Sequence, residues 1–153
     1  MEPPRSTAQR KTDVLEKLRT EPGTEKDVWV ASASASGDAY LIPLSYHWDG
    51  ARLTVATPTR SRTARNLRRA GVARMALPAT RDLDVIVEGT LEFIAVGDDD
   101  HLANEHTATA GFDARRARGE YVYIRLTPRK IQAWGEENEL VGRDVMLDGK
   151  WLA

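Results

Sequence analysis

Residues 39–57 read AYLIPLSYHWDGARLTVAT, and this stretch decides the fold class. The segments Ala39–Trp48 and 52–57 are rich in β-branched and aromatic residues, and Asp49-Gly50 between them is typical of the tight turn of a β-hairpin. Pro43 lies inside the first segment, and a strand proline has no N–H to donate. We therefore predict an antiparallel hairpin in which Pro43 marks an edge, a bulge or a place where something other than a strand lies alongside.

Strand-like segments continue on both sides of this hairpin. Gly89, inside one of them, is expected at a bulge or a close backbone approach. Two late segments, 121–126 and 130–134, are separated by Thr127-Pro128-Arg129, which predicts a break between them. A small terminal hairpin is expected around Asp148-Gly149. The expected strands outside the central hairpin are Val28–Ala35, Val72–Leu77, Asp84–Val96, Tyr121–Leu126, Lys130–Trp134, Val145–Leu147 and Lys150–Leu152.

Three short helices are expected between the strands. The first begins at about Thr7 and ends at Glu21-Pro22-Gly23, because proline cannot continue a helix. The second spans 62–70, with Ser61 suited to cap its start and Gly71 its end. The third opens at 98–100 and runs to about residue 110. Short strands with only small helices between them predict a mainly β fold, an antiparallel barrel or sandwich. We expect a flexible tail over 1–6 and a single domain over 7–153.

Composition narrows the function classes. The 153 residues carry a net charge of −1 and no cysteine, which excludes disulfides, a thiol nucleophile and thiolate metal sites. Neither a serine-hydrolase elbow nor a dinucleotide or P-loop phosphate motif occurs. No apolar run is long enough to span a membrane, and the N-terminus lacks the apolar stretch of a signal peptide. We therefore expect a cytoplasmic protein that binds neither membranes nor nucleic acid.

The three histidines give no catalytic or metal-binding pattern. His101 and Glu105 have the i,i+4 spacing that places two side chains on one helical face, but they match no zinc motif. We interpret His101 and His106 as decoration of a helix surface and expect no metal site. Tyr46 or His47 could donate a proton, although each fits a packed strand residue better, so we leave the catalytic residue unknown.

The stretch 57–69, TPTRSRTARNLRR, carries five arginines interleaved with hydroxyl side chains, where a strand ends and a helix begins. The first turn of a helix has unpaired N–H groups at the positive end of its dipole. The hydroxyls of Thr59, Ser61 and Thr63 can donate hydrogen bonds, while Arg62 and Arg65 can fork onto phosphate oxygens. The stretch therefore indicates an anion site, and a solvated basic helix face remains the alternative.

Several segments in this order resemble the flavin-binding split β-barrel family, also called the pyridoxamine 5'-phosphate oxidase-like family. The resemblance covers about residues 10–135. Its most specific element is the S-x-x-x-R-N-L run at 61–67, after a strand that ends in threonine. The similar segments are Asp27–Ala33, Tyr40–Gly50, Leu53–Thr57, Ser61–Arg69, Val87–Thr90 and Thr127–Trp134.

This resemblance implies a six-stranded antiparallel Greek-key barrel with a few short helices, forming a homodimer with two cofactor sites at its interface. Members bind FMN or the 8-hydroxy-5-deazaflavin coenzyme, and many reduce small unsaturated molecules. Thr57, Ser61, Arg62, Thr63, Arg65 and Asn66 would lie around the cofactor phosphate. Pro43, Leu44 and Ser45 would lie along the ring system, and Trp134 would approach it from the partner chain. Many members carry a lysine that meets the phosphate at the position of Thr63. The threonine in this chain therefore implies the loss of one charge-assisted hydrogen bond.

Three function hypotheses follow. The first is an oxidoreductase that passes a hydride between a bound FMN or deazaflavin and a small organic substrate, in which the cofactor supplies the difficult chemistry. The second is a flavin-binding or sequestering protein without turnover. The third is a nucleic-acid-binding barrel that uses the arginine-rich helix, which the absence of an aromatic residue in 57–69 disfavours. Four tryptophans in a short strand-rich chain favour a homodimer, because aromatic surface is enriched at interfaces.

Overall fold

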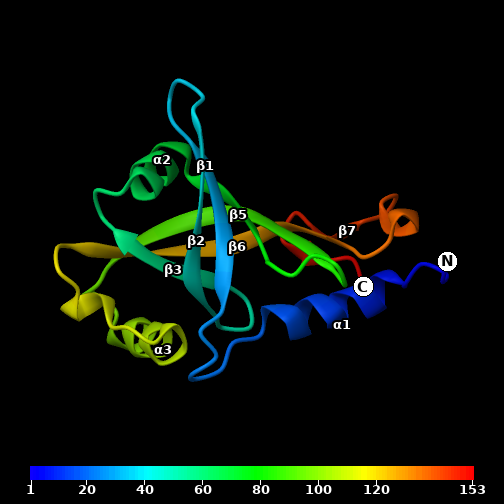
Figure 1. The fold of residues 1–153 in the computed structure, drawn as a ribbon, viewed down its shortest axis with the longest axis horizontal. Coiled ribbons are helices and arrows are strands. Elements are labelled where there is room, and N and C mark those ends of the chain that lie inside the picture. Colours follow the sequence, from blue (N-terminus) through cyan, green and yellow to red (C-terminus); the bar gives the residue numbers. More distant parts are fainter.

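A computed structural model describes residues 1–153 and shows a closed barrel with appended helices and a terminal hairpin (Figure 1). The six barrel strands are β1 (Asp27–Ala33), β2 (Ala39–Trp48), β3 (Leu53–Pro58), β4 (Val72–Ala76), β5 (Asp84–Ala95) and β6 (Tyr121–Trp134). The hairpin consists of β7 (Asp144–Leu147) and β8 (Lys150–Trp151). The helices are α1 (Thr7–Leu18), α2 (Arg62–Ala70) and α3 (Asp100–Ala110), with short 3-10 turns η1 (Ala114–Arg116) and η2 (Glu137–Glu139).

All strand pairs are antiparallel, and the sheet closes on itself. The order runs β3-β2-β1-β4-β5-β6, and β6 pairs back onto β3 from Leu53↔Leu126 to Pro58↔Tyr121. The chain thus passes from β3 through α2 to β4, which pairs with β1 rather than with β3. This is a Greek-key connection, and it confirms the predicted six-stranded barrel.

The barrel interior is filled by alternate side chains of every strand, as the period of two requires. Two of the three helices outside the sheet add to the same core: α1 through Val14 and Leu18, and α2 through Ala64 and Leu67. Among the strand residues that fill the interior are Val28, Val30, Val55, Val87, Ile124, Leu126 and Ile131.

The predicted break in the last barrel strand is wrong. Strand β6 is continuous through Thr127-Pro128-Arg129, with a register shift opposite Glu88 and Gly89. A Cβ at Gly89 would collide with the Thr127 carbonyl, which confirms the expected close approach. Pro128 pairs with Gly89 and lies next to this bulge, a position at which a strand tolerates a residue without an N–H.

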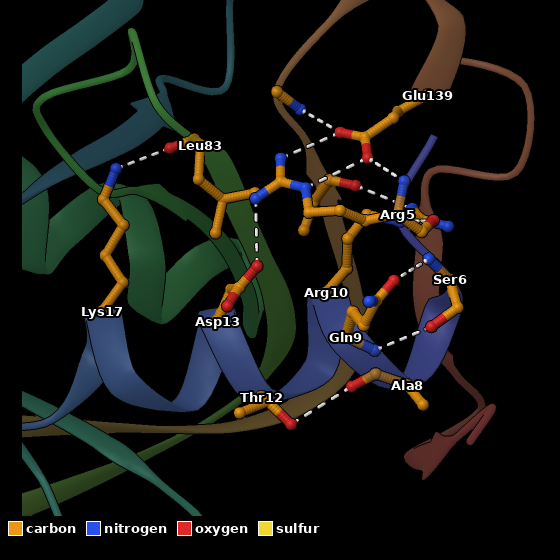
Figure 2. A network of polar contacts seen from close by, with 12 residues as sticks. Arg5, Ser6, Ala8, Gln9, Arg10, Thr12, Asp13, Lys17, Leu83 and Glu139 are labelled. Atoms are coloured by element: carbon orange, nitrogen blue, oxygen red, sulfur yellow. Dashed lines mark hydrogen bonds and ion pairs between the residues drawn. The ribbon is translucent and has the colours of Figure 1, made fainter. Parts of the chain in front are cut away.

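Helix α1 begins as its cap dictates. Ser6 and Gln9 form a capping box, in which each side chain accepts the other residue's amide, and the helix ends at Leu18. Before the cap, the Arg5 side chain donates to the carboxylate of Glu139 (Figure 2). The segment 1–6, expected as a flexible tail, is thus tied at Arg5 to the turn after β6.

The other two helices flank the barrel in different ways (Figure 1). Helix α2 ends at Gly71 in a left-handed cap, with φ of 74°, as the sequence predicts. Helix α3 covers the outer side of β3 and β6, where Leu102 and Ala103 pack with Ala56 and Tyr123. No helix in the structure is long and apolar enough to cross a membrane.

Candidate cofactor site

The N-terminus of α2 is organised around the Ser61 hydroxyl. Its oxygen accepts hydrogen bonds from the Ala64 amide at 3.1 Å and from the Thr57 hydroxyl at 3.0 Å. Since the oxygen accepts both, the proton of the Ser61 hydroxyl remains available to donate. The amides of Arg62 and Thr63 precede the first intrahelical hydrogen bond and have no acceptor within the helix. This turn therefore gathers several donors at the positive end of the helix dipole.

The arginines around this turn have no carboxylate partner. The side chains of all five are absent from every ion pair of the protein, although the chain as a whole has a net charge of −1. The Arg62 guanidinium lies 4.9 Å from the centre of the Tyr40 ring. This contact holds the plane of the guanidinium and leaves the N–H groups at its edge free to donate. The region is consequently a local excess of positive charge suited to an anion. The five residues are Arg60, Arg62, Arg65, Arg68 and Arg69.

Two predicted site residues point into the protein from the opposite side of α2. Asn66 is 6% exposed, and its Nδ2 donates to the Ser32 hydroxyl at 3.1 Å. Thr63 is fully buried, and its hydroxyl has no hydrogen-bond partner. A buried hydroxyl without a partner is costly, so Thr63 is either strained or a donor kept for a ligand. Asn66 already has the structural task of linking α2 to β1.

Pro43 lies on an open edge of β2, which agrees with the first of the three readings offered by the sequence. On one side it pairs with Trp29 of β1, whereas β3 joins the other side only from Tyr46 onward. Leu44 packs against the barrel core, and the Ser45 hydroxyl donates to Asp27 at 3.1 Å. Because Tyr40 of the same strand stacks with Arg62, the open edge lies beside the first turn of α2.

Trp134 is not brought to this turn within one chain. It ends β6 and pairs with Asp84, while the opposite end of β6 pairs with Pro58, just before α2 (Figure 1). The structure therefore joins Thr57, Ser61, Arg62 and Arg65 at one end of the barrel, places the open edge of β2 beside them, and leaves Trp134 at the far end.

The candidate proton donors occupy packed positions. Tyr46 is fully buried, its hydroxyl donates to the Leu18 carbonyl at 2.9 Å, and burial raises its pKa. The Nε2 atom of His47 lies 2.9 Å from a carboxylate oxygen of Glu105, beneath α3. His101 and Glu105 lie on one face of α3, as their spacing predicts, with Nε2 of His101 3.3 Å from the other carboxylate oxygen of Glu105. Residues so distant in sequence as His47 and Glu105 left no local pattern from which their contact could be predicted.

His106 corrects the reading of the third helix. It is fully buried, with its ring edge-on to Phe112 and Tyr123, rather than decorating the surface. Burial lowers its pKa to about 4, so the ring is neutral near pH 7. Sequence reasoning also missed Tyr40, because its contact with Arg62 depends on how the β1–β2 hairpin leans toward α2.

A closed six-stranded antiparallel barrel with a Greek-key connection and three short helices defines the class of split barrels. The family model described as pyridoxamine 5'-phosphate oxidase matches residues 14–135, most of the chain, and the protein belongs to this family. Membership places it, at family level, among flavin-related oxidoreductases. No curated protein matches the sequence.

Solved structures share the fold at low sequence identity. An F420 reductase matches with a TM-score of 0.55 and 16% identity, over 70% of this chain and 89% of that one. An FMN-binding protein related to pyridoxamine 5'-phosphate oxidase, from Nostoc punctiforme, matches with a TM-score of 0.52 and 14% identity, over 83% of this chain and 78% of that one. A heme binding protein from Mycobacterium smegmatis matches with a TM-score of 0.61 and 18% identity, over 97% of this chain and 60% of that one. At these identities the likenesses establish the fold alone.

Proposed function

We propose that this protein is a homodimeric oxidoreductase that binds FMN, or alternatively the 8-hydroxy-5-deazaflavin coenzyme, and passes a hydride between it and a small organic substrate. The observation that carries the proposal is the first turn of α2, where free amides, the Ser61 hydroxyl and unpaired arginines converge. Such a turn suits a phosphate because the amides of Arg62 and Thr63, the proton of the Ser61 hydroxyl and the Arg65 guanidinium have no acceptor within the protein.

The residues present fit a phosphorylated cofactor. Thr57 orients the Ser61 hydroxyl by donating to it, so that the Ser61 proton points away toward a ligand. Arg65 is exposed one turn into the helix and has no competing carboxylate. The buried Thr63 hydroxyl adds a donor without a partner. Thr63 replaces the lysine of many relatives, and the unpaired Arg60 and Arg62 supply positive charge in its place.

The open edge of β2 supports the placement of the ring system. An unpaired strand edge offers backbone groups that a planar heterocycle can contact in place of a neighbouring strand. Pro43 keeps such an edge from pairing, because it has no N–H to offer a strand. We therefore assign Pro43, Leu44 and Ser45 to binding the ring, mainly through their backbone, and the α2 turn to binding the phosphate.

A homodimer would complete this site. Strand register aligns Pro43, Trp29, Ala76 and Ile86 in one row across the outer face of β2, β1, β4 and β5. Trp29 is 40% exposed in the monomer, an unusual position for a large aromatic ring outside an interface. Pairing of two such faces would also let Trp134, which lies far from α2 in its own chain, approach the partner's cofactor.

The bound cofactor would supply the hydride chemistry. The chain's own part is to hold the phosphate at α2, to keep the ring against the edge of β2, and to shield the ring from water with apolar residues. Tyr46 is committed to the Leu18 carbonyl, so we assign it no proton transfer. No side chain is assigned as the catalytic residue.

The first test is identification of the cofactor. Absorbance and mass of whatever co-purifies are measured, and the cofactor-free protein is then titrated with FMN and with the deazaflavin. We expect saturable binding of at least one, reversed by competing phosphate. Absence of binding to either, in a protein shown to be folded, would contradict the proposal.

The second test separates an enzyme from a protein that only sequesters the cofactor. The cofactor-bound protein is mixed with a panel of small conjugated acceptors in the presence of excess reductant, and the redox state of the cofactor is followed spectroscopically. We expect repeated turnover with at least one acceptor under anaerobic conditions. Tight binding without turnover would favour the sequestering alternative.

Light scattering at micromolar concentration should give the mass of a dimer, and a monomer across that range would exclude the shared site.

A further inference from the structure

The carboxylate of Glu139 is the most heavily coordinated side chain of the protein. Its Oε2 accepts from the Arg5 amide at 2.7 Å and from Arg5 Nε at 3.1 Å, and its Oε1 accepts from Arg5 Nη2 at 2.9 Å. A fourth donor, the Gly135 amide, reaches Oε1 at 2.7 Å. Its side chain is only 3% exposed, and the Arg5 hydrogen bond holds the pKa of Glu139 down at about 2.

These bonds fix the main chain on both sides of Trp134. Before it, the Ala133 carbonyl accepts from Arg10 Nη1 at 2.9 Å, and after it the Gly135 amide is held by Glu139. A Cβ at Gly135 would collide with the Arg5 guanidinium, so glycine is what lets Arg5 approach this closely. Trp134 itself stays partly exposed between two anchored neighbours.

Holding helix α1 in place does not require this arrangement. Val14 and Leu18 already bury α1 in the barrel core, and Arg5 lies before the helix cap. The Glu139 side chain is buried, whereas that of Arg5 is 32% exposed. Such a guanidinium–carboxylate pair adds little net stability, because desolvation and solvent screening offset its attraction, but it fixes geometry closely. The geometry fixed here is that of the chain immediately after Trp134.

We propose that Arg5, acting through Glu139 and the Gly135 amide, is a positioning residue that sets Trp134 in place for the partner subunit's cofactor. The inference rests on the proposed placement of Trp134. Arg10 supports the same strand end from the other side through the Ala133 carbonyl. The segment before α1 thereby becomes part of the cofactor site of the dimer, although it lies far from α2 in its own chain.

The first part of the test needs no cofactor. Amide hydrogen exchange is measured over residues 132–140 in the wild type, in Arg5→Ala and in Asp13→Asn, which removes only the other ion pair of Arg5. We expect exchange in this segment to rise about tenfold or more in Arg5→Ala and to stay near wild type in Asp13→Asn. Unchanged exchange in Arg5→Ala would overturn the inference. Arg5→Lys, which keeps the charge without the fork, should fall between the two.

The second part measures affinity for whichever of FMN or the deazaflavin binds. We expect Trp134→Ala and Arg5→Ala each to weaken binding by about threefold to tenfold, and the double variant to be no weaker than Trp134→Ala alone. Additive losses would show that Arg5 does not act through Trp134 and would overturn the inference. So would unchanged binding in Trp134→Ala, even where Arg65→Ala still weakens it. Loss of effect in Arg65→Ala would instead overturn the proposed function.

Discussion

At one end of the barrel Arg5 meets the buried carboxylate of Glu139, whereas at the other end the arginines around the first turn of α2 meet no carboxylate. Arginine side chains thus serve different purposes at the two ends of the barrel. Where a carboxylate lies within reach, the guanidinium joins two segments of the chain. Where none does, its donors stay available to a ligand, and the local charge attracts an anion.

This difference teaches how to distinguish a binding arginine from a structural one. The number of arginines in a stretch does not separate the two uses, because an exposed basic helix face has the same composition. What separates the two uses is whether the guanidinium already has an acceptor within the protein. Arg69 belongs to the arginine-rich helix, yet its Nη2 donates to the Ala33 carbonyl at 2.8 Å. The side chain of Arg65, by contrast, makes neither a hydrogen bond nor an ion pair within the protein.

The largest effect on stability is expected at Glu139. Glu139→Ala should lower the free energy of unfolding by about 2–4 kcal/mol, because it leaves the Arg5 guanidinium and the Gly135 amide without their acceptor. Arg65→Ala should change it by less than about 0.5 kcal/mol, as for an exposed side chain without partners. Urea denaturation at pH 7 measures both. Equal losses in the two variants would remove the distinction between the two ends.

Acid should remove the contribution of the ionised Glu139 carboxylate to the free energy of unfolding. Its pKa is about 2 in the folded protein, against an ordinary value of 4.5, so its stabilisation is complete above about pH 4.5 and lost as pH falls toward 2. The difference in unfolding free energy between wild type and Glu139→Gln should therefore shrink over this range. His106 is the same in both proteins, so its own titration cancels. A difference that stays constant down to pH 3 would contradict the assigned ion pair.

Two substitutions at Ser61 separate its capping role from its ligand role. Ser61→Ala should cost about 1 kcal/mol of stability, whereas Ser61→Gly should cost only a few tenths, since glycine is a tolerated N-cap. Both remove the hydroxyl and should weaken cofactor binding alike, by about twofold to tenfold. If binding follows stability instead, Ser61 acts only as a cap.

The smallest effect is expected at Thr63. Thr63→Val preserves shape and removes a buried hydroxyl without a partner, so the cofactor-free protein should be as stable or up to about 1 kcal/mol more stable. Cofactor affinity should nevertheless fall several-fold if the hydroxyl serves the ligand. Thermal unfolding with and without cofactor measures both quantities. Unchanged affinity would show that the hydroxyl is strain rather than a contact.

The sequence predicted most elements because local signals agree with the fold. Asp49-Gly50 placed the hairpin turn, Ser61 and Gly71 bounded α2, and Pro43 indicated the open edge of β2. Thr127-Pro128-Arg129 misled because a proline in a strand usually ends it, and only the bulge opposite Gly89 reveals how β6 absorbs it.

The site could be predicted only in part, because long-range contacts leave no local pattern. The hydroxyls and arginines around the start of α2 lie within one stretch of sequence, so the candidate anion site could be predicted from that stretch alone. The Arg5–Glu139 contact joins residues 134 positions apart, and the tail looked flexible because nothing near Arg5 in sequence requires a partner. The burial of His106 depends on which face of α3 meets the barrel, which its weak amphipathic pattern did not decide.

The most direct test of the central claim compares Arg65→Ala with Arg69→Ala in titrations with FMN and with the deazaflavin. Arg65 lies near the unpaired amides of α2, while Arg69 lies one turn further along and is bound to Ala33. With both variants folded, Arg65→Ala should weaken binding by about tenfold to a hundredfold, the value of about 1.5–3 kcal/mol for one charge-assisted hydrogen bond, and Arg69→Ala far less. Equal affinities in the two variants would show that the arginines form only a solvated face and that the phosphate does not bind at α2.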